Sequence, residues 1–324
     1  MVHSDILAAI GNTPLITVPF KSEGLILAKL EYLNPGGSVK DRSALFMIEQ
    51  AEAAGLLKPG GTLIDASSGN QGIATAMIGA IKGYKVIITV SEKSSQEKLA
   101  AIQAYGAKVV ICPATTFLQD PRSYHSQACA LHAQIPNSFM PNQYYNPCNA
   151  QAHYTSLGPE IWRQTNGKIT HFIAGAGTSG TVSGVGAFLK EKNPAIKVYA
   201  LDSIHSFRAT QGKPTPYQLE GLGMDFDTPI YNPAVVDEII TVTDNDALAM
   251  LKKLAHQHGL LVGPSSGAVA WAAEHYAPKL TKNDCVVIIF GDSGRAYLSK
   301  GFFKKEDHIS PSCGSYAQKT ELSE

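Results

Sequence analysis

Three polar stretches of this 324-residue sequence contain side chains that could do chemistry. The first is NPGGSVKDR (34–42), in which Lys40 follows a Pro-Gly-Gly bend at the point where a helix is expected to begin. The positive end of a helix dipole disfavours a second positive charge. The charged form of the Lys40 amine is therefore disfavoured, so the amine could act as a nucleophile or Schiff-base partner. Taken in isolation, an ordinary exposed lysine explains this stretch better.

The second stretch, GAGTSG (175–180), satisfies the pattern G-x-G-x-x-G between an expected strand and an expected helix. Asp202 ends the next expected strand, near where a ribose-binding acid would stand, so one interpretation is an NAD site. The alternative is a cradle for a single phosphate, because Thr178, Ser179 and Thr181 add hydroxyl donors to the backbone amides. A structural turn without a ligand is the third interpretation.

The third stretch is SSGNQG (67–72), a polar turn between apolar segments. Its amides and hydroxyls could hold a carboxylate, although such turns also cap helices that bind nothing. Like the second stretch, it has the pattern of strand, Gly/Ser-rich turn and helix. Each turn would present backbone N–H groups at the carboxyl edge of a sheet. Two such turns facing one cleft would hold a ligand with two separate anionic groups.

The elements that position these stretches alternate along the chain. Strands are expected at 26–31, 62–66, 85–90, 108–112, 171–175, 197–202, 238–242 and 285–290. Several are apolar on successive residues, which is typical of strands covered on both faces. Segments 43–55, 95–106 and 245–259 have helical periodicity and end on Gly. The alternation predicts an α/β fold with open, twisted, mainly parallel sheets and helices on both faces.

No Ser/Pro-rich linker marks a domain boundary in this sequence. We expect a smaller, mobile α/β domain at 41–145, inserted into a larger one. The larger α/β domain, formed by 1–40 and 146–303, is expected to bind the cofactor. Residues 304–324 are polar and without periodicity, so we expect a loose tail there.

Composition excludes some classes of function. The 27 basic residues balance the 27 acidic ones, so no global field favours nucleic acid or acidic membranes as partners. The five cysteines stand singly, which suits a reducing compartment. The first fifteen residues lack a secretory signal, and the apolar run at 285–290 is strand-length. His256 and His258 face opposite ways on a helix and suit no metal. We expect a cytoplasmic protein without a metal.

Together, these stretches resemble the fold-type II family of pyridoxal-phosphate enzymes, the cysteine synthase and cystathionine β-synthase group. The resemblance runs from Ile10 to Lys304. It includes IGNTPL (10–15), NPGGSVKDR (34–42), SSGNQG (67–72), AYGAKVV (104–110), QYYNPCNAQAHY (143–154), AGTSGT (176–181), EGLGMDF (220–226), GPSSGA (263–268) and DSGRAYL (292–298). It implies two sheets of the tryptophan synthase β type, pyridoxal 5'-phosphate as cofactor and a homodimer.

The same resemblance implies roles for individual residues. Lys40 is expected to be the catalytic lysine that forms the internal aldimine with the cofactor. The other expected cofactor-binding residues are Asn70 at the ring hydroxyl, Ser265 at the pyridine nitrogen, and Gly177, Thr178, Ser179, Gly180 and Thr181 at the phosphate. The expected substrate-binding residues are Ser67, Ser68, Gly69, Gln71, Gln143 and Gly221. A neutral Ser at the ring nitrogen makes a weaker electron sink than a carboxylate would, which suits β-elimination more than transamination.

The implied activity is β-replacement on L-serine or an O-activated serine. Lys40 would remove the α-proton, the group on Cβ would leave to give an aminoacrylate, and a thiol would add to it. The partners would be small amino-acid and thiol substrates. The segments 143–154, 217–226 and 292–298 favour cystathionine β-synthase, which takes serine and homocysteine.

Several alternatives remain open at this stage. A cysteine synthase would take O-acetylserine and sulfide, and a specialised enzyme would use another nucleophile. Gln71 stands where the family usually has Thr, and Gly291 where it often has Pro, so the substrate is not fixed. From other classes, an NAD dehydrogenase or a scaffold that binds cofactor without turnover is possible.

Overall fold

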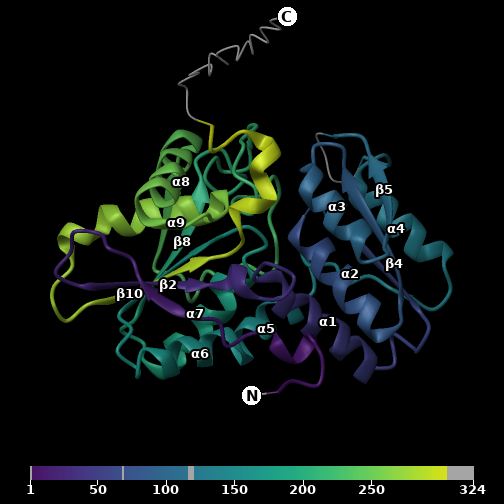
Figure 1. Ribbon diagram of the computed structural model, residues 1–324, viewed down its shortest axis with the longest axis horizontal. Coiled ribbons are helices and arrows are strands. Elements are labelled where there is room, and N and C mark those ends of the chain that lie inside the picture. The colour runs from purple at the N-terminus through teal and green to yellow at the C-terminus, as the bar shows by residue number, and fades with distance from the viewer. Residues whose placement is uncertain (1, 68, 116–119, 305–324) are drawn as a thin grey trace, which may run out of the picture.

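The computed structural model describes residues 2–67, 69–115 and 120–304. In these residues the chain forms two lobes side by side, each built around one sheet (Figure 1). The larger sheet has six strands in the order β1-β2-β10-β7-β8-β9, and the smaller has four in the order β5-β4-β3-β6. Only the β1–β2 pair is antiparallel among the strand pairs of the described residues. This architecture confirms the predicted α/β class with two mainly parallel sheets.

The eight predicted strands are present, with ends within one residue of those expected. In the larger sheet the strands are β1 (Leu15–Thr17), β2 (Leu25–Leu30), β7 (His171–Gly175), β8 (Lys197–Ser203), β9 (Glu238–Val242) and β10 (Cys285–Phe290). In the smaller sheet they are β3 (Thr62–Ala66), β4 (Lys85–Ser91), β5 (Lys108–Cys112) and β6 (Ser138–Phe139). The sequence did not predict β1 and β6, because two or three residues are too few to show a period.

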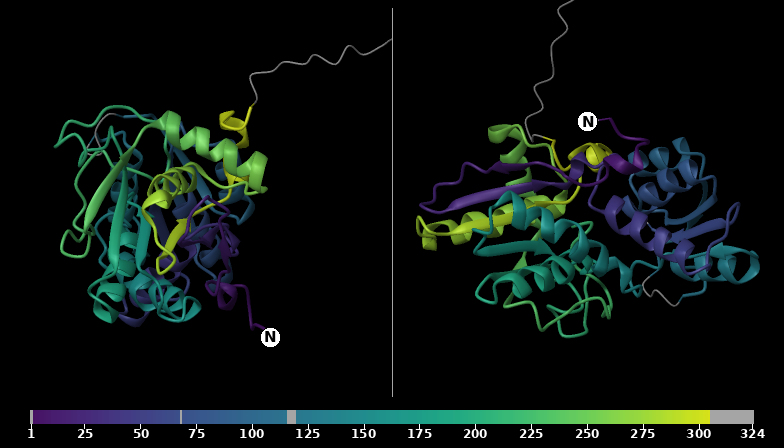
Figure 2. Two further views of the ribbon diagram at one scale, coloured as in Figure 1. Left: turned by 90° about the vertical axis from the view of Figure 1, so that its left-hand side faces the viewer. Right: turned by 90° about the horizontal axis from the view of Figure 1, so that it is seen from below.

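Helices cover both sheets (Figure 2). The α-helices are α1 (Lys40–Ala53), α2 (Asn70–Lys82), α3 (Gln96–Ala104), α4 (Tyr124–Gln134), α5 (Cys148–Thr155), α6 (Leu157–Gln164), α7 (Gly180–Lys192), α8 (Asp244–His258) and α9 (Pro264–Tyr276). Short 3-10 turns are η1 (Leu7–Ala9), η2 (Glu31–Leu33), η3 (Ala277–Lys279) and η4 (Gly294–Lys300). Within the described ranges, every helix is too short or too polar to cross a bilayer.

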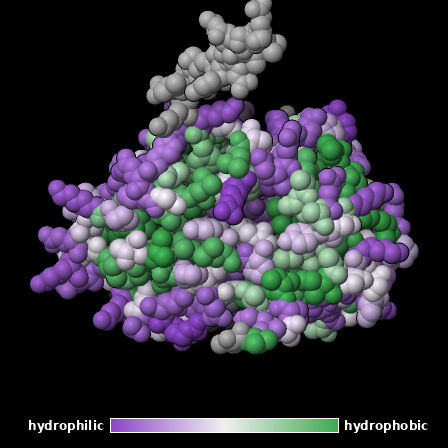
Figure 3. Space-filling model, viewed as in Figure 1, coloured by the Kyte–Doolittle hydropathy of each residue, from purple (hydrophilic) through white to green (hydrophobic). Residues whose placement is uncertain are grey.

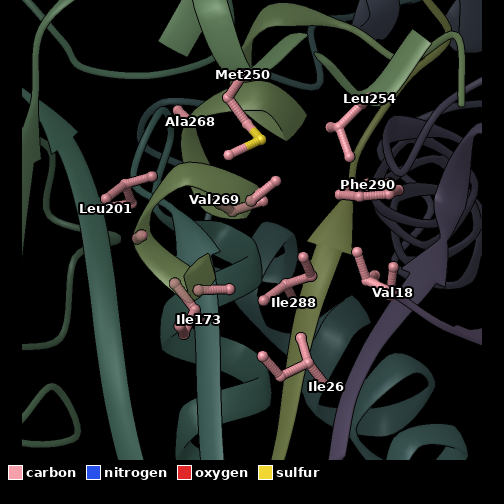
Figure 4. Close-up of a cluster of buried hydrophobic side chains, with 14 of the residues drawn as sticks. Val18, Ile26, Ile173, Leu201, Met250, Leu254, Ala268, Val269, Ile288 and Phe290 are labelled. Atoms are coloured by element: carbon pink, nitrogen blue, oxygen red, sulfur yellow. The ribbon is translucent and has the colours of Figure 1, made fainter. Parts of the chain in front are cut away.

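The larger lobe has a hydrophobic core on each face of its sheet, one against the helices α8 and α9 and one against α6 and α7. Ile26, Ile173 and Ile288 project from neighbouring strands toward Val269 of α9 and Met250 of α8 (Figure 4). All six residues of β10 are buried. Each large apolar side chain buried in this way contributes about 1.5–3 kcal/mol. This packing makes β10 a rigid support for the residues that follow it.

The strand ends bring the predicted functional stretches to one edge of each sheet. The turn at 67–72 follows β3, the turn at 175–180 follows β7, and Gly291 follows β10. The carboxyl ends of parallel strands share an edge, so such segments gather there. Helix α1 contacts both α2 of the smaller lobe and α5 of the larger one. Apolar side chains gather over both lobes on the face shown in Figure 3, with a strongly hydrophilic group at their junction.

The smaller sheet lies within residues 62–139, inside the domain predicted at 41–145. The limits of that domain and its mobility stay predictions. The predicted tail lies outside the described residues from position 305 onward.

Candidate active site

One cavity brings together residues from distant parts of the chain. It is lined by Lys40, by residues of the turn at 177–181, by Gly221, by Ser265 near the start of α9, and by Gly291. The sequence placed all of these segments on the cofactor or substrate side. The structure therefore collects the predicted lysine, the phosphate turn and the predicted ring-nitrogen partner around one space.

Lys40 begins α1, as the Pro-Gly-Gly bend predicts. Its side chain keeps some exposed surface, because it opens onto the cavity. The surrounding protein removes most of the water from its amine, and this desolvation lowers the pKa of Lys40 against the raising effect of Asp292. The Lys40 ammonium makes no hydrogen bond or ion pair within the described part of the chain, so it is available to a ligand.

The turn at 177–181 is built for a close approach of backbone to ligand. Ser179 adopts a left-handed φ of 66°, and α7 begins at the next residue. A Cβ atom on Gly177 would lie 2.7 Å from the carbonyl oxygen of Gly221, so only glycine fits there. The first backbone N–H groups of α7 and the hydroxyls of Thr178 and Thr181 are donors suited to a phosphate.

Helix α5 lies directly behind this turn. Asn149 Nδ2 donates to Thr178 Oγ1 at 3.0 Å and to the Gln143 carbonyl oxygen at 2.8 Å. His153 Nε2 lies 3.4 Å from Thr181 Oγ1. Sequence reasoning missed both residues as site residues, since it used the segment 143–154 only as part of the resemblance. Their spacing of four residues on one helix is the signal that could have found them.

Asn70 begins α2, and its side chain reaches across to the larger lobe. Asn70 Nδ2 donates to Asp292 Oδ2 at 2.7 Å, and the Tyr297 hydroxyl donates to the same oxygen. Burial raises the pKa of Asp292, whereas the charge of Lys98 and these two hydrogen bonds lower it. Asp292 directly follows Gly291, which the sequence singled out only as a departure from the family pattern.

Most of the predicted carboxylate-binding residues are neighbours of Asn70 in the chain, in the turn at 67–72. Ser67 Oγ accepts hydrogen bonds from the backbone of Gly69 at 3.2 Å and of Gly72 at 3.0 Å. Gln71 is 1% exposed, and its Oε1 accepts a hydrogen bond from Ser43 Oγ at 3.4 Å. Gln143 is buried. Ser68 lies outside the described residues. The turn at 67–72 is not among the segments that line the cavity, and its carboxylate role stays a prediction.

An ion pair that the sequence did not reveal joins the lobes beside this turn. Lys98 Nζ on α3 lies 2.6 Å from Glu220 Oε2, and 4.0 Å from the centre of the Tyr297 ring. Lys300 Nζ lies 3.3 Å from the other oxygen of Glu220. A Cβ atom on Gly69 would lie 3.1 Å from Lys98 Nζ, so this amine lies against the predicted carboxylate turn. A lysine within an amphipathic segment gives no sequence signal of such a contact.

Asp202 decides between the dinucleotide and phosphate interpretations of the turn after β7. This carboxylate is 1% exposed, and it accepts hydrogen bonds from Ser206 Oγ at 2.7 Å and from the Ser203 backbone at 2.9 Å. It is therefore occupied inside the protein and does not face a ribose. The geometry favours a single phosphate over a dinucleotide.

Comparison with known proteins agrees with this geometry. Residues 6–292 match the family described as pyridoxal-phosphate dependent enzyme. The chain belongs to this family. As a pyridoxal-phosphate enzyme it uses pyridoxal 5'-phosphate as its cofactor, and its relatives named cystathionine β-synthase and cysteine synthase confirm the resemblance.

Named relatives cover most of this pyridoxal-phosphate enzyme. It is 46% identical to a cystathionine β-synthase of Apis mellifera over 92% of this chain, and it spans only 61% of the length of that relative. It is 40% identical to an O-acetylserine dependent cystathionine β-synthase of Bacillus subtilis, covering 94% of this chain and 98% of that one. A cysteine synthase of Staphylococcus aureus is 39% identical, with the same coverage of 94% and 98%.

Solved structures give the same result. The O-acetylserine dependent cystathionine β-synthase of Helicobacter pylori superimposes with a TM-score of 0.87 at 36% identity, covering 94% of this chain and all of that one. An O-ureido-L-serine synthase superimposes with a TM-score of 0.88 at 32% identity, covering 96% and 98%.

The residues around the cavity fit the cofactor of the family. Lys40 offers an amine that has no partner among the described residues and could bond to the aldehyde carbon of pyridoxal phosphate. The turn at 177–181 offers amides and hydroxyls for the phosphate, and Gly177 leaves room where a side chain would collide with Gly221. Ser265 lines the same cavity with a neutral hydroxyl.

Proposed function

We propose that this enzyme catalyses β-replacement on L-serine or an O-activated serine with a thiol nucleophile, and that the thiol is homocysteine. The observation that carries the proposal is the shared cavity of Lys40, the phosphate turn and the neutral Ser265. Relatives named cystathionine β-synthase support homocysteine as the nucleophile. The reaction class needs an amine that can move a proton and a site that holds an amino acid beside it.

Bound pyridoxal phosphate supplies an electron sink that stabilises negative charge on the α-carbon of an amino acid. Lys40 would take the proton from that carbon onto Nζ and later return it, since its lowered pKa makes the free amine accessible. Thr178 and Thr181 would donate to the phosphate. Ser265 would face the ring nitrogen without fixing a proton there, which favours loss of the group on Cβ.

We propose that the turn at 67–69 and Gln143 hold the substrate carboxylate. Asp292 would keep the Asn70 amide oriented, since it accepts from Asn70 Nδ2. The Lys98–Glu220 ion pair connects the two lobes beside this turn. It would exclude water from the reacting group while the lobes are together.

The deciding experiment crosses two donors with several nucleophiles. The holoenzyme is incubated with L-serine or O-acetylserine, each with homocysteine, sulfide or hydroxyurea, and the products are identified by mass spectrometry. We expect cystathionine to form with the highest kcat/KM. If the main product is cysteine formed from sulfide, the enzyme is a cysteine synthase and the assignment to homocysteine is wrong. Absence of any product from all pairs would overturn β-replacement and favour a cofactor-binding scaffold.

One observation favours a third kind of product, formed from a nucleophile that is not a thiol. Gln71 stands in the turn at 67–72 where the family usually has Thr, and one structural neighbour is an O-ureido-L-serine synthase. A main product from hydroxyurea would therefore assign a specialised enzyme with a nucleophile that is not a thiol. We also propose that the enzyme is a homodimer in the cytoplasm. Light scattering of the purified holoenzyme tests the dimer by its mass.

A further inference from the structure

We propose that Asn149 and His153 form a donor pair on α5 that turns the hydroxyl hydrogens of Thr178 and Thr181 toward the cofactor phosphate. The proposal rests on the phosphate role assigned to the turn at 177–181. It makes Asn149 and His153 positioning residues, because they act through the threonines and not on the cofactor itself.

The two side chains leave the same face of α5. They are four residues apart, which places them one turn from each other on a helix. Both are fully buried. Asn149 Nδ2 donates to Thr178 Oγ1 at 3.0 Å. A hydroxyl that accepts one hydrogen bond still has its own hydrogen to donate, so Thr178 can direct that hydrogen to a phosphate oxygen.

Glycines let α5 approach closely enough for this contact. A Cβ atom on Gly180 would lie 2.1 Å from Asn149 Oδ1. A Cβ atom on Gly184, one turn further along α7, would lie 2.1 Å from the carbonyl oxygen of Ala150. Any side chain at these two positions would push α5 away from the phosphate turn. The short Asn149 side chain then could not reach Thr178.

His153 can serve Thr181 in the same way if its proton is on Nε2. Burial, and after it the positive charges of Lys40 and Arg42, lower the pKa of His153 well below its usual value. The ring is therefore neutral and carries one N–H. Its Nε2 lies 3.4 Å from Thr181 Oγ1, a long contact that binding of the cofactor would shorten.

The two tautomers of His153 have opposite consequences. A proton on Nε2 makes the ring a donor to Thr181, whose own hydrogen then points to the phosphate. A proton on Nδ1 would make Nε2 an acceptor, so Thr181 would donate to the ring and the phosphate would lose one donor. Nδ1 makes no hydrogen bond with the described residues, so nothing there holds the proton on that nitrogen. The geometry therefore favours the Nε2 tautomer.

Nitrogen NMR of the unmodified holoenzyme tests the tautomer directly. The protein is labelled with ¹⁵N-histidine, and the His153 signals are assigned by their loss in a His153→Gln variant. We expect the shifts of a neutral ring with its proton on Nε2 at neutral pH. A proton on Nδ1, or a charged ring, would overturn the role of His153.

A double-mutant cycle tests whether His153 acts through Thr181. Apoenzyme carrying His153→Leu, Thr181→Val or both is titrated with pyridoxal phosphate, and binding is followed by visible absorbance. A hydrogen bond between neutral groups is worth about 0.5–1.5 kcal/mol, so we expect His153→Leu to weaken binding by about two- to tenfold. In the Thr181→Val background the same change should have no further effect. An equal loss in both backgrounds would show a packing role and overturn the proposal.

Conservative variants separate hydrogen bonding from packing. His153→Gln keeps a donor amide near the position of Nε2 and should retain most of the affinity. Asn149→Asp keeps the shape of Asn149 but replaces its donor by an acceptor and adds a negative charge behind the phosphate turn, so it should weaken binding of pyridoxal phosphate more than tenfold. Unchanged affinity of the Asp variant would contradict the Asn149 half of the pair. These titrations contain no amino acid, so they stay readable whichever β-replacement reaction the enzyme performs.

Discussion

Asn70 Nδ2 donates a hydrogen bond of 2.7 Å to Asp292 Oδ2, which joins residues 222 positions apart. The bond connects the start of α2 in the smaller lobe to the end of β10 in the larger one. Tyr297 donates to the same carboxylate oxygen. Among the described residues no donor contacts Asn70 Oδ1, so this oxygen is available to a ligand. The carboxylate of Asp292 therefore sets which way the Asn70 amide faces the proposed cofactor site.

Replacing Asp292 by Asn should disturb this orientation without changing the shape of the side chain. Its amide nitrogen or oxygen must adapt to Asn70 and Tyr297 together, and the charge that both of them contact is lost. Hydrogen bonds to charged groups are worth about 1.5–3 kcal/mol, so we expect kcat/KM to fall ten- to a hundredfold. Asp227→Asn, at an exposed carboxylate, is the control. A kcat/KM equal to that of the parent enzyme would contradict this role.

Lys40→Ala should abolish turnover while the phosphate turn still binds the cofactor. General acid–base catalysis by a positioned amine is worth about 10²–10⁴-fold, so product formation should fall by at least that factor. Binding of pyridoxal phosphate is measured separately by equilibrium dialysis. Lys213→Ala, at an exposed lysine, serves as the matched control. The assignment of Lys40 fails if the alanine variant with bound cofactor turns over like the parent.

The sequence predicted the fold well because the buried strands carry their own signal. Strand β10 is buried at every residue, and its unbroken apolar run CVVIIF reveals it directly. The sequence did not predict strands β1 and β6, because they form by pairing with β2 and β3 and show no local pattern. The same distinction separates local from long-range structure throughout the chain.

The candidate site was predictable only where one short segment carries the chemistry. Lys40 and the turn at 177–181 stand out because glycines and hydroxyls cluster locally. Asp292, Asn149 and His153 were missed, because each acts by touching a residue far away in the sequence. Their side chains are ordinary in type, and only the packing of α5 and the end of β10 gives them a function.

Breaking the Lys98–Glu220 ion pair should loosen the contact between the lobes. The Lys98 side chain is 3% exposed and that of Glu220 is 28% exposed, so the pair is only partly screened by water. Lys98→Met should raise KM for the amino-acid substrate and speed limited proteolysis. In a double-mutant cycle with Glu220→Gln, we expect a coupling of about 1 kcal/mol in the free energy of unfolding. Strictly additive effects would show that the pair contributes nothing.

Glu160 should make the protein sensitive to acid. Burial raises the pKa of Glu160, but the hydrogen bond and charge of Arg42, and then Lys29, outweigh it and hold this pKa at about 2. The folded state thus binds the proton less readily than the unfolded state, whose pKa is near 4.5. Stability from Glu160 is present above that value and is lost as the pH falls toward about 2.

A Glu160→Gln variant tests this dependence through urea unfolding at a series of pH values. Breaking a buried ion pair costs about 3–5 kcal/mol, so the variant should be less stable by that amount at neutral pH. The difference from the parent should shrink as the pH falls below about 4.5. Glu23→Gln, at an exposed position, should show neither effect. If the difference in the free energy of unfolding between variant and parent stays constant with pH, Glu160 does not contribute to the acid sensitivity.

Gln71→Thr should lower stability more than it alters substrate binding. Gln71 was predicted to contact the substrate carboxylate, yet its side chain is buried against Ser43 and Asp65. Burial raises the pKa of Asp65 to about 6, and the hydrogen bond that Thr75 Oγ1 donates at 2.7 Å partly offsets that rise. Thr is too short to span the same gap, so we expect a loss of about 1–3 kcal/mol in the free energy of unfolding.

The amino-acid KM of the Gln71→Thr variant distinguishes the two roles. If Gln71 supports the turn at 67–72 from inside the protein, the variant has lower stability and a KM close to that of the parent. A direct carboxylate contact predicts the reverse, because the shorter hydroxyl would change the pocket and leave the interior intact. Urea unfolding and steady-state kinetics on the same preparation decide between them. Unchanged stability together with a raised KM would show that Gln71 contacts the substrate carboxylate, as the sequence predicted.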